Sequence, residues 1–516
     1  MATAVRVVPN TYFDSVALMV VAGQLSQQPG VTLASLVMGT SANRALLAEA
    51  GVDPAVIAHA GPNDLIIVVQ AESAERAEAL VAEALTQLTS TRAPATPTGD
   101  GAAPRPRSLR TALRHAADAN LVLISTPGAF AAIEAEEALR AGKHVFLFSD
   151  NVPLEAEVRL KRLAAEQGLL VMGPDCGTAL IGGVGLGFAN AVQRGPIGII
   201  AASGTGLQQV SCLIDWLGSG VSHGIGVGSR DLSAAVGGAT MQAALAALAN
   251  DPATQVIVLL SKPPAHEVAA RVLAAAHATG KPVVAAFLGA HLSAPEGVTV
   301  VPTLTAAAQA AVALATGQST GSSAIDPIPI DTLTHERASL SPEQRFVRGL
   351  YSGGTLCEEA LWILSQRLGP AWSNVPLDPA YRLPNPHQSH EHTLLDLGDD
   401  ELTVGRPHPM IDHTLRIERL HREAADPTTA VILLDVVLGY GAHPDPASVL
   451  APAIAAARQH ARQHGRGLPI IVTLVGTERD PQRLSRQRRA LEEAGALVTT
   501  SNVSAAEAAA QLLADR

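Results

Sequence analysis

Short apolar runs rich in valine and isoleucine recur along the chain, separated by stretches with helical periodicity. This alternation is typical of parallel strands whose two faces are covered by helices. The pattern predicts strands at residues 5–8, 33–38, 65–69, 121–125, 144–148, 169–172, 197–201, 224–227, 256–260 and 282–287. Helices are expected between them, so the pattern predicts an α/β protein with parallel sheets.

Three irregular stretches interrupt this alternation. Residues 93–106 and 317–329 are rich in proline, glycine and serine, which is typical of linkers. Residues 372–392 contain several prolines and histidines and are too long for an ordinary connection. We expect this third stretch to pass over a surface of the protein or of a partner.

Part of the pattern occurs twice. Residues 197–218 predict a strand, a Ser-Gly turn and a helix, and residues 346–369 predict the same series. The later segments stay in step as the pairs 228–231 and 398–400, 256–260 and 431–435, 282–289 and 469–476, and 301–311 and 498–510. The second copy alone carries an insert, at about residues 401–425. Repetition in fixed order indicates two domains of one architecture.

We call residues 196–316 the first repeat and residues 345–516 the second repeat. An N-terminal α/β segment at 1–95 and a Rossmann-like domain at 108–195 precede them, and a linker at 317–344 joins them. The N-terminal segment is either the first half of the Rossmann-like domain or a separate α/β module.

Composition and charge exclude several classes of function for this protein. Of the 516 residues, 47% are hydrophobic and 16% are charged, which is typical of a globular protein. The net charge of -11 argues against nucleic-acid binding. The cysteines at 176, 212 and 357 are too scattered for a disulfide framework or a zinc site, so we expect no metal. Neither a signal peptide nor an apolar run of ~18 residues is visible, so we expect a cytoplasmic protein.

The Ser-Gly turns of the two repeats follow strands, where open parallel sheets bind ligands. Glycine lets the backbone approach an anion, and the amides and dipole of the following helix favour negative charge. The candidate phosphate- or substrate-binding residues are Ser203, Gly204, Thr205 and Gly206 in the first turn and Ser352, Gly353, Gly354 and Thr355 in the second. Each Ser-Gly pair could simply join a strand to a helix. Its recurrence at the same place in both repeats favours the binding of a phosphate or acyl phosphate.

Other polar residues also follow predicted strands. The further candidates for substrate binding are Asp175, Cys176, Arg230, Lys262, Thr477 and Arg479. A lysine or arginine there could hold a carboxylate or phosphate, with surface pairing as the alternative. Cys176 has no base close by in the sequence, as a nucleophilic thiol would need.

The insert of the second repeat contains the string Gly-Arg-Pro-His-Pro-Met-Ile-Asp at 405–412. Two prolines around one histidine prevent a regular helix. Arg406 could bind a carboxylate, and His408 could act as an acid or base near neutral pH. We therefore expect Arg406, His408 and Asp412 to be catalytic, with a structural histidine as the alternative.

Two common nucleotide-binding motifs are missing. The sequence has no Gly-x-x-x-x-Gly-Lys-Ser/Thr loop, and no Gly-x-Gly-x-x-Gly follows a predicted strand. We expect no nucleotide to be bound by this chain alone.

Residues 124–177 resemble the CoA-binding domain of the succinyl-CoA synthetase alpha subunit. The shared strings are Ser-Thr-Pro-Gly-Ala-Phe at 125–130, Asp-Asn-Val-Pro at 150–153 and Gly-Pro-Asp-Cys at 173–176. The two repeats resemble the flavodoxin-like ligase domains of that enzyme's two subunits. With the strings at 38–40, 261–264, 405–412 and 476–481, the chain resembles the FdrA family over nearly its whole length.

This resemblance implies a Rossmann-like CoA-binding-type domain followed by two flavodoxin-like domains. FdrA proteins are called acyl-CoA synthetases and are also linked to carbamoyl transfer from oxamate in allantoin breakdown, with partner subunits. The synthetases carry phosphate on a histidine within Gly-His-Ala-Gly-Ala, whereas His291 lies here within Ala-His-Leu-Ser at 290–293. Their glycine-rich CoA turn reads here as Pro-Asn-Thr-Tyr-Phe-Asp at 9–14, and the sequence shows no ATP-grasp domain.

We therefore predict a transferase subunit that acts through an acyl or carbamoyl phosphate, with oxamate carbamoyltransferase as the particular activity. The alternatives are an acyl-CoA synthetase that uses a partner's nucleotide-binding subunit, and a non-catalytic scaffold. The expected ligands are phosphate and a small carboxylate, with CoA left open as a cofactor. Partner subunits or further copies of the chain are expected, but neither nucleic acid nor a membrane.

Overall fold

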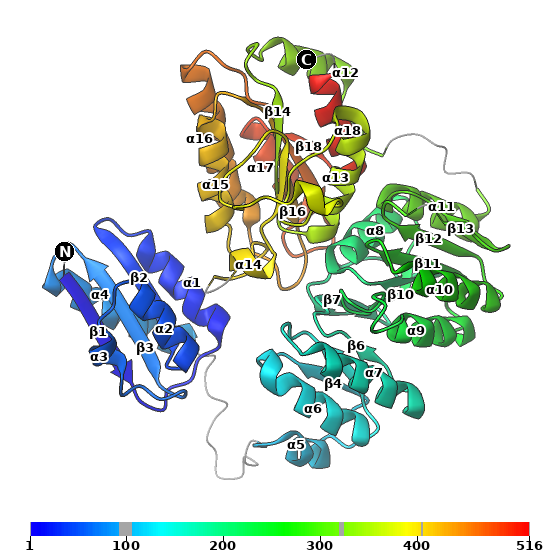
Figure 1. Ribbon diagram of the computed structural model, residues 1–516, viewed down its shortest axis with the longest axis horizontal. Coiled ribbons are helices and arrows are strands. Elements are labelled where there is room, and N and C mark those ends of the chain that lie inside the picture. Colours follow the sequence, from blue (N-terminus) through cyan, green and yellow to red (C-terminus); the bar gives the residue numbers. More distant parts are fainter. Residues whose placement is uncertain (1, 92–105, 291, 319–324, 404–405, 515–516) are drawn as a thin grey trace. The chain divides into compact units, whose positions relative to one another are not determined.

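The computed structural model describes residues 2–91, 106–290, 292–318, 325–403 and 406–514. The chain forms two compact units, shown as ribbons in Figure 1. One comprises Met1–Arg105 and Thr403–His408, and the other comprises Pro106–Leu402 and Pro409–Arg516. The N-terminal segment therefore belongs to a unit of its own rather than to the Rossmann-like domain.

The N-terminal unit is built on a three-stranded sheet in the order β1-β3-β2. Its elements are β1 (Ala2–Val8), α1 (Ser15–Ser26), β2 (Val31–Met38), α2 (Ser41–Glu49), α3 (Pro54–Ile57), β3 (Leu65–Ala71) and α4 (Ala74–Thr91). All three predicted strands are present, but both pairings are antiparallel, so the expectation of a parallel sheet was wrong here. The central strand β3 is buried almost throughout and therefore has the continuous apolar run of a parallel strand.

The Rossmann-like domain contains a short parallel sheet in the order β4-β5-β6. Its elements are α5 (Leu109–His115), β4 (Leu121–Ile124), α6 (Gly128–Arg140), β5 (His144–Leu147), α7 (Leu154–Gln167) and β6 (Val171–Met172). A hairpin of β7 (Thr178–Ile181) and β8 (Val184–Gly187) follows, and β7 pairs with β10 of the first repeat. This glycine-rich hairpin was not predicted, and it ties the domain to the next sheet.

The two repeats have the same strand topology. The first contains β9 (Ile197–Ala201), α8 (Gly204–Trp216), β10 (Val221–Gly226), α9 (Ala239–Asn250), β11 (Val256–Ser261), α10 (His266–Ala278), β12 (Val283–Phe287), β13 (Val298–Val300) and α11 (Leu304–Thr316). Its parallel strands run in the order β10-β9-β11-β12-β13. The second repeat runs β15-β14-β16-β17-β18, so the internal repetition predicted from the sequence is confirmed.

The second repeat has more helices than the first. After α12 (Ile330–Ala338) come β14 (Phe346–Tyr351), α13 (Gly354–Leu368), the short helix Pro379–Tyr381, β15 (Thr393–Asp396), α14 (Asp400–Thr403), α15 (Thr414–Ala425), β16 (Thr429–Val437), α16 (Pro446–Gln463), β17 (Ile470–Val475), α17 (Leu484–Glu493), β18 (Leu497–Thr499) and α18 (Asn502–Leu513). None of the described helices has both the length and the apolar character that a membrane span requires.

Helices α8 and α11 of the first repeat pack with α13 and α18 of the second, and one hydrophobic core contains residues from all four. Polar side chains also cross this junction. Gln209 Nε2 donates to the carbonyl of Thr500 at 2.9 Å, and the Leu304 amide donates to Glu359 Oε1 at 2.7 Å. The two repeats thus share a core rather than merely touching.

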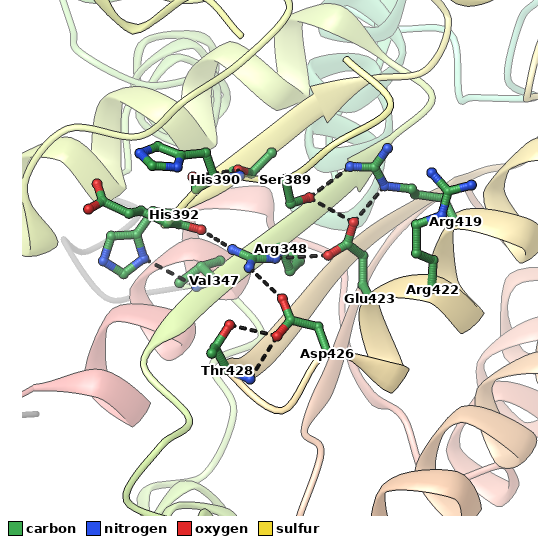
Figure 2. A network of polar contacts seen from close by, with 12 residues as sticks. Val347, Arg348, Ser389, His390, His392, Arg419, Arg422, Glu423, Asp426 and Thr428 are labelled. Atoms are coloured by element: carbon green, nitrogen blue, oxygen red, sulfur yellow. Dashed lines mark hydrogen bonds and ion pairs between the residues drawn. The ribbon is translucent and has the colours of Figure 1, made fainter. Parts of the chain in front are cut away.

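The irregular stretch at 372–392 covers the second repeat itself, which confirms that it passes over a surface. Trp372 packs edge-on against Tyr381 and His390, with ring centroids 5.7 and 4.8 Å apart. Figure 2 shows the buried charges beneath it, where Arg348 of β14 lies 2.8 Å from Glu423 and Arg419 lies 2.5 Å from the same carboxylate. Arg419 also donates to the Pro386 carbonyl at 2.9 Å and to the Ser389 hydroxyl at 2.7 Å, and these contacts fix the stretch against α15.

Candidate functional site

The first Ser-Gly turn connects β9 to α8. Ser203 has extended backbone angles and caps the helix, because its Oγ accepts a hydrogen bond from the Gly206 amide at 2.9 Å. The helix begins at Gly204, so its free amides and positive dipole end lie at the carboxyl edge of the sheet.

The second turn, between β14 and α13, has a buried carboxylate behind it. Asp435 of β16 accepts hydrogen bonds from the Ser352 amide at 2.7 Å and from the Ser352 hydroxyl at 3.0 Å. Arg416 of α15 lies 3.0 Å from the same carboxylate and is itself 1% exposed. Burial raises the pKa of Asp435 although Arg416 opposes the shift. The insert therefore supplies Arg416 as a support for the second turn.

The two turns meet. Ser203 Oγ lies 2.5 Å from Thr355 Oγ1, so a hydrogen bond joins the repeats at this point. A methyl group added at Gly353 would lie 2.7 Å from Thr205 Oγ1, a contact that only glycine avoids. The N-termini of α8 and α13 therefore converge at one edge.

Charged side chains surround the converging turns. Lys262, which follows β11, lies 2.6 Å from Glu358 Oε1 of α13. A Cβ added at Gly354 would lie 2.5 Å from Asp396 Oδ2 and 3.4 Å from Lys262 Nζ, so Lys262 and Asp396 flank that glycine. Burial lowers the pKa of Lys262, but the Glu358 and Asp396 carboxylates outweigh it and the pKa is raised.

Asp396 ends β15 and is buried. Its burial raises the pKa of the carboxyl to about 7, although the Lys262 charge opposes this shift. Burial likewise raises the pKa of Glu358. Both carboxyls can therefore exchange protons closer to neutral pH than an ordinary carboxylic acid.

Asp175 of the Rossmann-like domain belongs to the same group. The surrounding protein desolvates its carboxyl, and Asp400 and Asp150 add negative charge, which together raise its pKa to about 6. Its side chain is exposed at this edge, so solvent weakens the shift relative to that of a fully enclosed carboxyl. We call Asp175, Lys262, Glu358, Asp396 and Asp400 the charged edge.

Cys176 does not line this edge. The residue is 2% exposed, and its Sγ contacts the Thr178 carbonyl oxygen at 3.5 Å. Burial raises the pKa of the thiol to about 12, so it stays protonated at neutral pH. A role for Cys176 in substrate contact is therefore corrected to one in packing.

Arg230, Thr477 and Arg479 each contact another domain. Arg230 pairs with buried Glu157 at 2.9 Å. The Thr477 hydroxyl donates to the Ala191 carbonyl at 2.7 Å, and Arg479 pairs with Asp215 at 2.8 Å. A role for these three residues in substrate binding stays a prediction.

The predicted catalytic group in the insert is divided between the two compact units. Arg406 and His408 belong to the other compact unit, with residues 1–105. Asp412 Oδ1 accepts a hydrogen bond from the Thr414 amide at 2.8 Å, at the start of α15. Gly405 and His291 lie outside the described residues. A catalytic role for Arg406 and His408 stays a prediction.

A cavity of about 440 Å³ opens where β12 ends. Its lining includes Gly289, Leu292, Ser293 and Val301 from the first repeat and Trp362 from α13 of the second. Both repeats therefore contribute to a space that could hold the body of a small ligand.

The sequence made both turns, Lys262 and Asp175 candidates, but it did not point to Glu358, Asp396 or Asp435, which the structure places around them. Asp435 had a usable signal, because it is the single charge inside the apolar run of β16. Asp396 likewise ends an apolar strand.

Comparison with known proteins shows which protein families these domains resemble. Residues 350–512 match the CoA-ligase family, and residues 1–105 match the AllF heavy metal-associated domain. The succinate–CoA ligase subunit alpha 2 of Archaeoglobus fulgidus is 30% identical over 196 residues, covering 37% of this chain and 65% of that protein. The chain thus contains a CoA-ligase domain of the succinyl-CoA synthetase type.

The uncharacterized protein YahF of Escherichia coli K12 is 42% identical over 504 residues, which cover 97% of each chain. The chain belongs to the same family as YahF. An acetyl-coenzyme A synthetase of Candidatus Korarchaeum cryptofilum covers 76% of this chain and 82% of its own, at 15% identity and a TM-score of 0.32.

The heavy metal-associated match raises the question of a metal in the N-terminal unit. All three cysteines lie outside residues 1–105, so this unit lacks the thiolates that soft metals prefer. The described residues also contain no group of three or more histidine, cysteine, aspartate or glutamate residues that could hold a metal ion. The residues of this unit therefore do not fit such a metal.

Proposed function

We propose that this chain is the acyl-transferring component of a CoA-ligase-type enzyme and works through an acyl phosphate. The convergence of the α8 and α13 N-termini, joined by Ser203 and Thr355, is the observation that carries this proposal. The CoA-ligase match of the second repeat supports it.

In this proposal, the phosphoryl group binds beside the paired hydroxyls. The amides of Gly204 and Gly354, at the first helical positions, would face its negative charge. Lys262 would neutralise the charge that develops on the phosphate oxygens. Asp396, with its pKa of about 7, would accept or return a proton at neutral pH.

The substrate class follows from the relatives' names. One relative is a succinate–CoA ligase subunit, and a sulfoacetate–CoA ligase subunit of Acholeplasma is 29% identical over 201 residues. Both names describe a small carboxylic acid with a second anionic group. We propose such an acid as the acyl donor, with CoA as the acceptor and a partner subunit as the source of nucleotide.

The test uses the chain purified with its natural partner proteins. With succinate, CoA and a nucleoside triphosphate, the complex should form a CoA thioester. Lys262→Met should lower kcat/KM by ~100-fold or more, the scale of removing one group that stabilises transition-state charge. Lys143→Met should leave it unchanged, because Lys143 only donates to the Ala117 carbonyl in the Rossmann-like domain.

A second candidate is carbamoyl transfer between phosphate and oxamate, as the resemblance to FdrA proteins implies. One observation favours it over CoA chemistry. Residues 9–14, which replace the glycine-rich CoA turn, connect β1 to α1 in the antiparallel N-terminal unit. A Rossmann-type CoA turn is therefore not formed by that segment.

Two further assays distinguish the candidates. Oxamate-dependent release of phosphate from carbamoyl phosphate, without thioester formation, would establish the second candidate. If the intact complex has either activity and Lys262→Met does not reduce it, the charged edge has no catalytic role. A scaffold function would then be the better explanation.

A further inference from the structure

A second cavity, of about 290 Å³, lies in the second repeat between α12 and α16. His335 and Glu336 of α12, Arg458 and Arg462 of α16, and residues 465–468 of the following loop line it. The loop leads into β17 at Ile470, whereas β17 ends at Val475, at the edge where the parallel strands β14 and β16 also end. The cavity is therefore at the opposite edge of the sheet from the two turns.

Its charge is positive in an acidic chain. Three arginines and one glutamate line it, which gives +3 and -1, or +2 with His335 neutral. The whole chain carries -11. The net charge of the lining is therefore opposite in sign to that of the whole chain.

Only one of the three arginines is neutralised by a carboxylate of the lining. Arg458 lies 2.8 Å from Glu336 Oε1. Arg466 is 8% exposed and donates to two backbone carbonyls, those of Ala424 at 2.9 Å and Asp426 at 3.2 Å. Arg462 is exposed to solvent at the cavity. Two guanidinium charges therefore lack a lining carboxylate.

The three arginines recur every four residues, so Arg458 and Arg462 share one face of α16 and Arg466 follows where the helix has ended. Like charges at this spacing destabilise a helix by ~0.2–0.5 kcal/mol per pair. An anion between them would remove this repulsion. Guanidinium groups also bind phosphate and carboxylate through paired hydrogen bonds.

The loop wall of the cavity is fixed by a close approach. The Gly467 amide donates to the Ser339 carbonyl at 2.8 Å, and a Cβ at Gly467 would lie 1.9 Å from Ser339 Oγ. Gln344 Nε2 also donates to the Gly467 carbonyl at 2.8 Å. The arginines are therefore attached to a preformed wall.

We propose that this cavity binds a small polyanion that carries phosphate or several carboxylates. Its ligand is separate from the acyl phosphate proposed at the turns, since the two places occupy opposite edges of the sheet. The proposal does not depend on the proposed function.

Inorganic pyrophosphate is the first probe, titrated into the full chain by isothermal calorimetry at fixed ionic strength. We expect saturable binding with a Kd of ~1 mM or tighter. Arg462→Glu, at an exposed position, should weaken it at least ~10-fold because it reverses one charge. Arg489→Glu makes the same change on the exposed face of α17 and should leave binding unchanged.

A tricarboxylate probe distinguishes the two ligand chemistries, and sodium chloride at equal ionic strength controls for screening. Saturation by either probe, with loss in Arg462→Glu alone, supports the site. The proposal is overturned if neither probe saturates, or if both variants bind equally well. Circular dichroism of each variant confirms that a loss of binding does not reflect unfolding.

Discussion

Lys161 of α7 is one of several charged side chains that the protein holds away from water. Its Nζ lies 2.9 Å from Glu157 and 2.8 Å from Asp231, and all three side chains are at most 1% exposed. Asp231 also accepts hydrogen bonds from the Thr240 and Met241 amides at the start of α9. This group joins the Rossmann-like domain to the first repeat.

Removing the lysine should therefore be costly. Lys161→Met leaves the buried Asp231 carboxylate without a cation and leaves Glu157 with Arg230 alone, and we expect the free energy of unfolding to fall by ~3–5 kcal/mol. Urea denaturation followed by circular dichroism measures this change.

The control for that prediction is Arg140→Met. Arg140 pairs with Glu136 at 2.7 Å on the surface, with 67% of its side chain exposed. Its loss should change stability by no more than ~1 kcal/mol. Equal effects of the two substitutions would show that the buried group is not a stabilising contact.

The charged edge shows what a sequence can reveal at this scale. Lys262 and Asp175 stand out because each follows a strand. Glu358 does not, since its position in the first turns of α13 looks like any helical glutamate until Lys262 is placed 2.6 Å away. Contacts between residues that are far apart in sequence decide which polar side chains form a site.

At the scale of elements, the two strand–turn–helix units are the parts that the site requires. Ser203 caps α8, and Thr303 caps α11 in the same way, with its Oγ accepting from the Ala306 amide at 3.1 Å. The two caps belong to the same repeat but only Ser203 also contacts Thr355. Comparing substitutions at the two caps therefore separates an effect on stability from an effect on activity.

Ser203→Ala and Thr303→Ala should each lower stability by ~1 kcal/mol through loss of the cap. Only Ser203→Ala should also lower the turnover of the complex with its partners, because it breaks the hydrogen bond between the turns. Thermal unfolding and the activity assay together test this expectation. Equal losses of activity in the two variants would contradict it.

Elements with a strong local pattern were predictable from the sequence. The strand at 197–201 was found because it is a short apolar run before a Ser-Gly turn, and its counterpart at 346–351, which contains Arg348, was found because it precedes the matching turn of the repeat. Pairing was not predictable for β3, since burial on both of its faces hides the difference between parallel and antiparallel neighbours. The hairpin at 178–187 was missed because glycine breaks its alternation.

For the larger unit as a whole, the junction between the repeats contains a buried acid. Glu359 is fully buried and accepts hydrogen bonds from the Leu304 amide and from Asn502 Nδ2 at 2.8 Å. Burial raises the pKa of Glu359 to about 7 despite these donors. An unfolded glutamate ionises near pH 4.5, so the folded state retains a proton that the unfolded state releases.

Stability should consequently fall as pH rises from about 4.5 to about 7, because the unfolded state binds fewer protons in that window. The loss of unfolding free energy due to Glu359 over this pH range is on the order of 3 kcal/mol. Glu359→Gln should reduce the slope of unfolding free energy against pH. Exposed Glu267→Gln is the matched control and should not. An unchanged slope in Glu359→Gln would contradict the assignment.

The common core of the repeats has one more consequence. Because α8 and α11 bury their apolar faces with α13 and α18, neither repeat can open without exposing the other's interior to water. The covalent connection between the two repeats holds them at a high effective concentration and fixes their ratio at one to one. The chain therefore behaves as a heterodimer that cannot dissociate, and damage to either half lowers the cooperative stability of both.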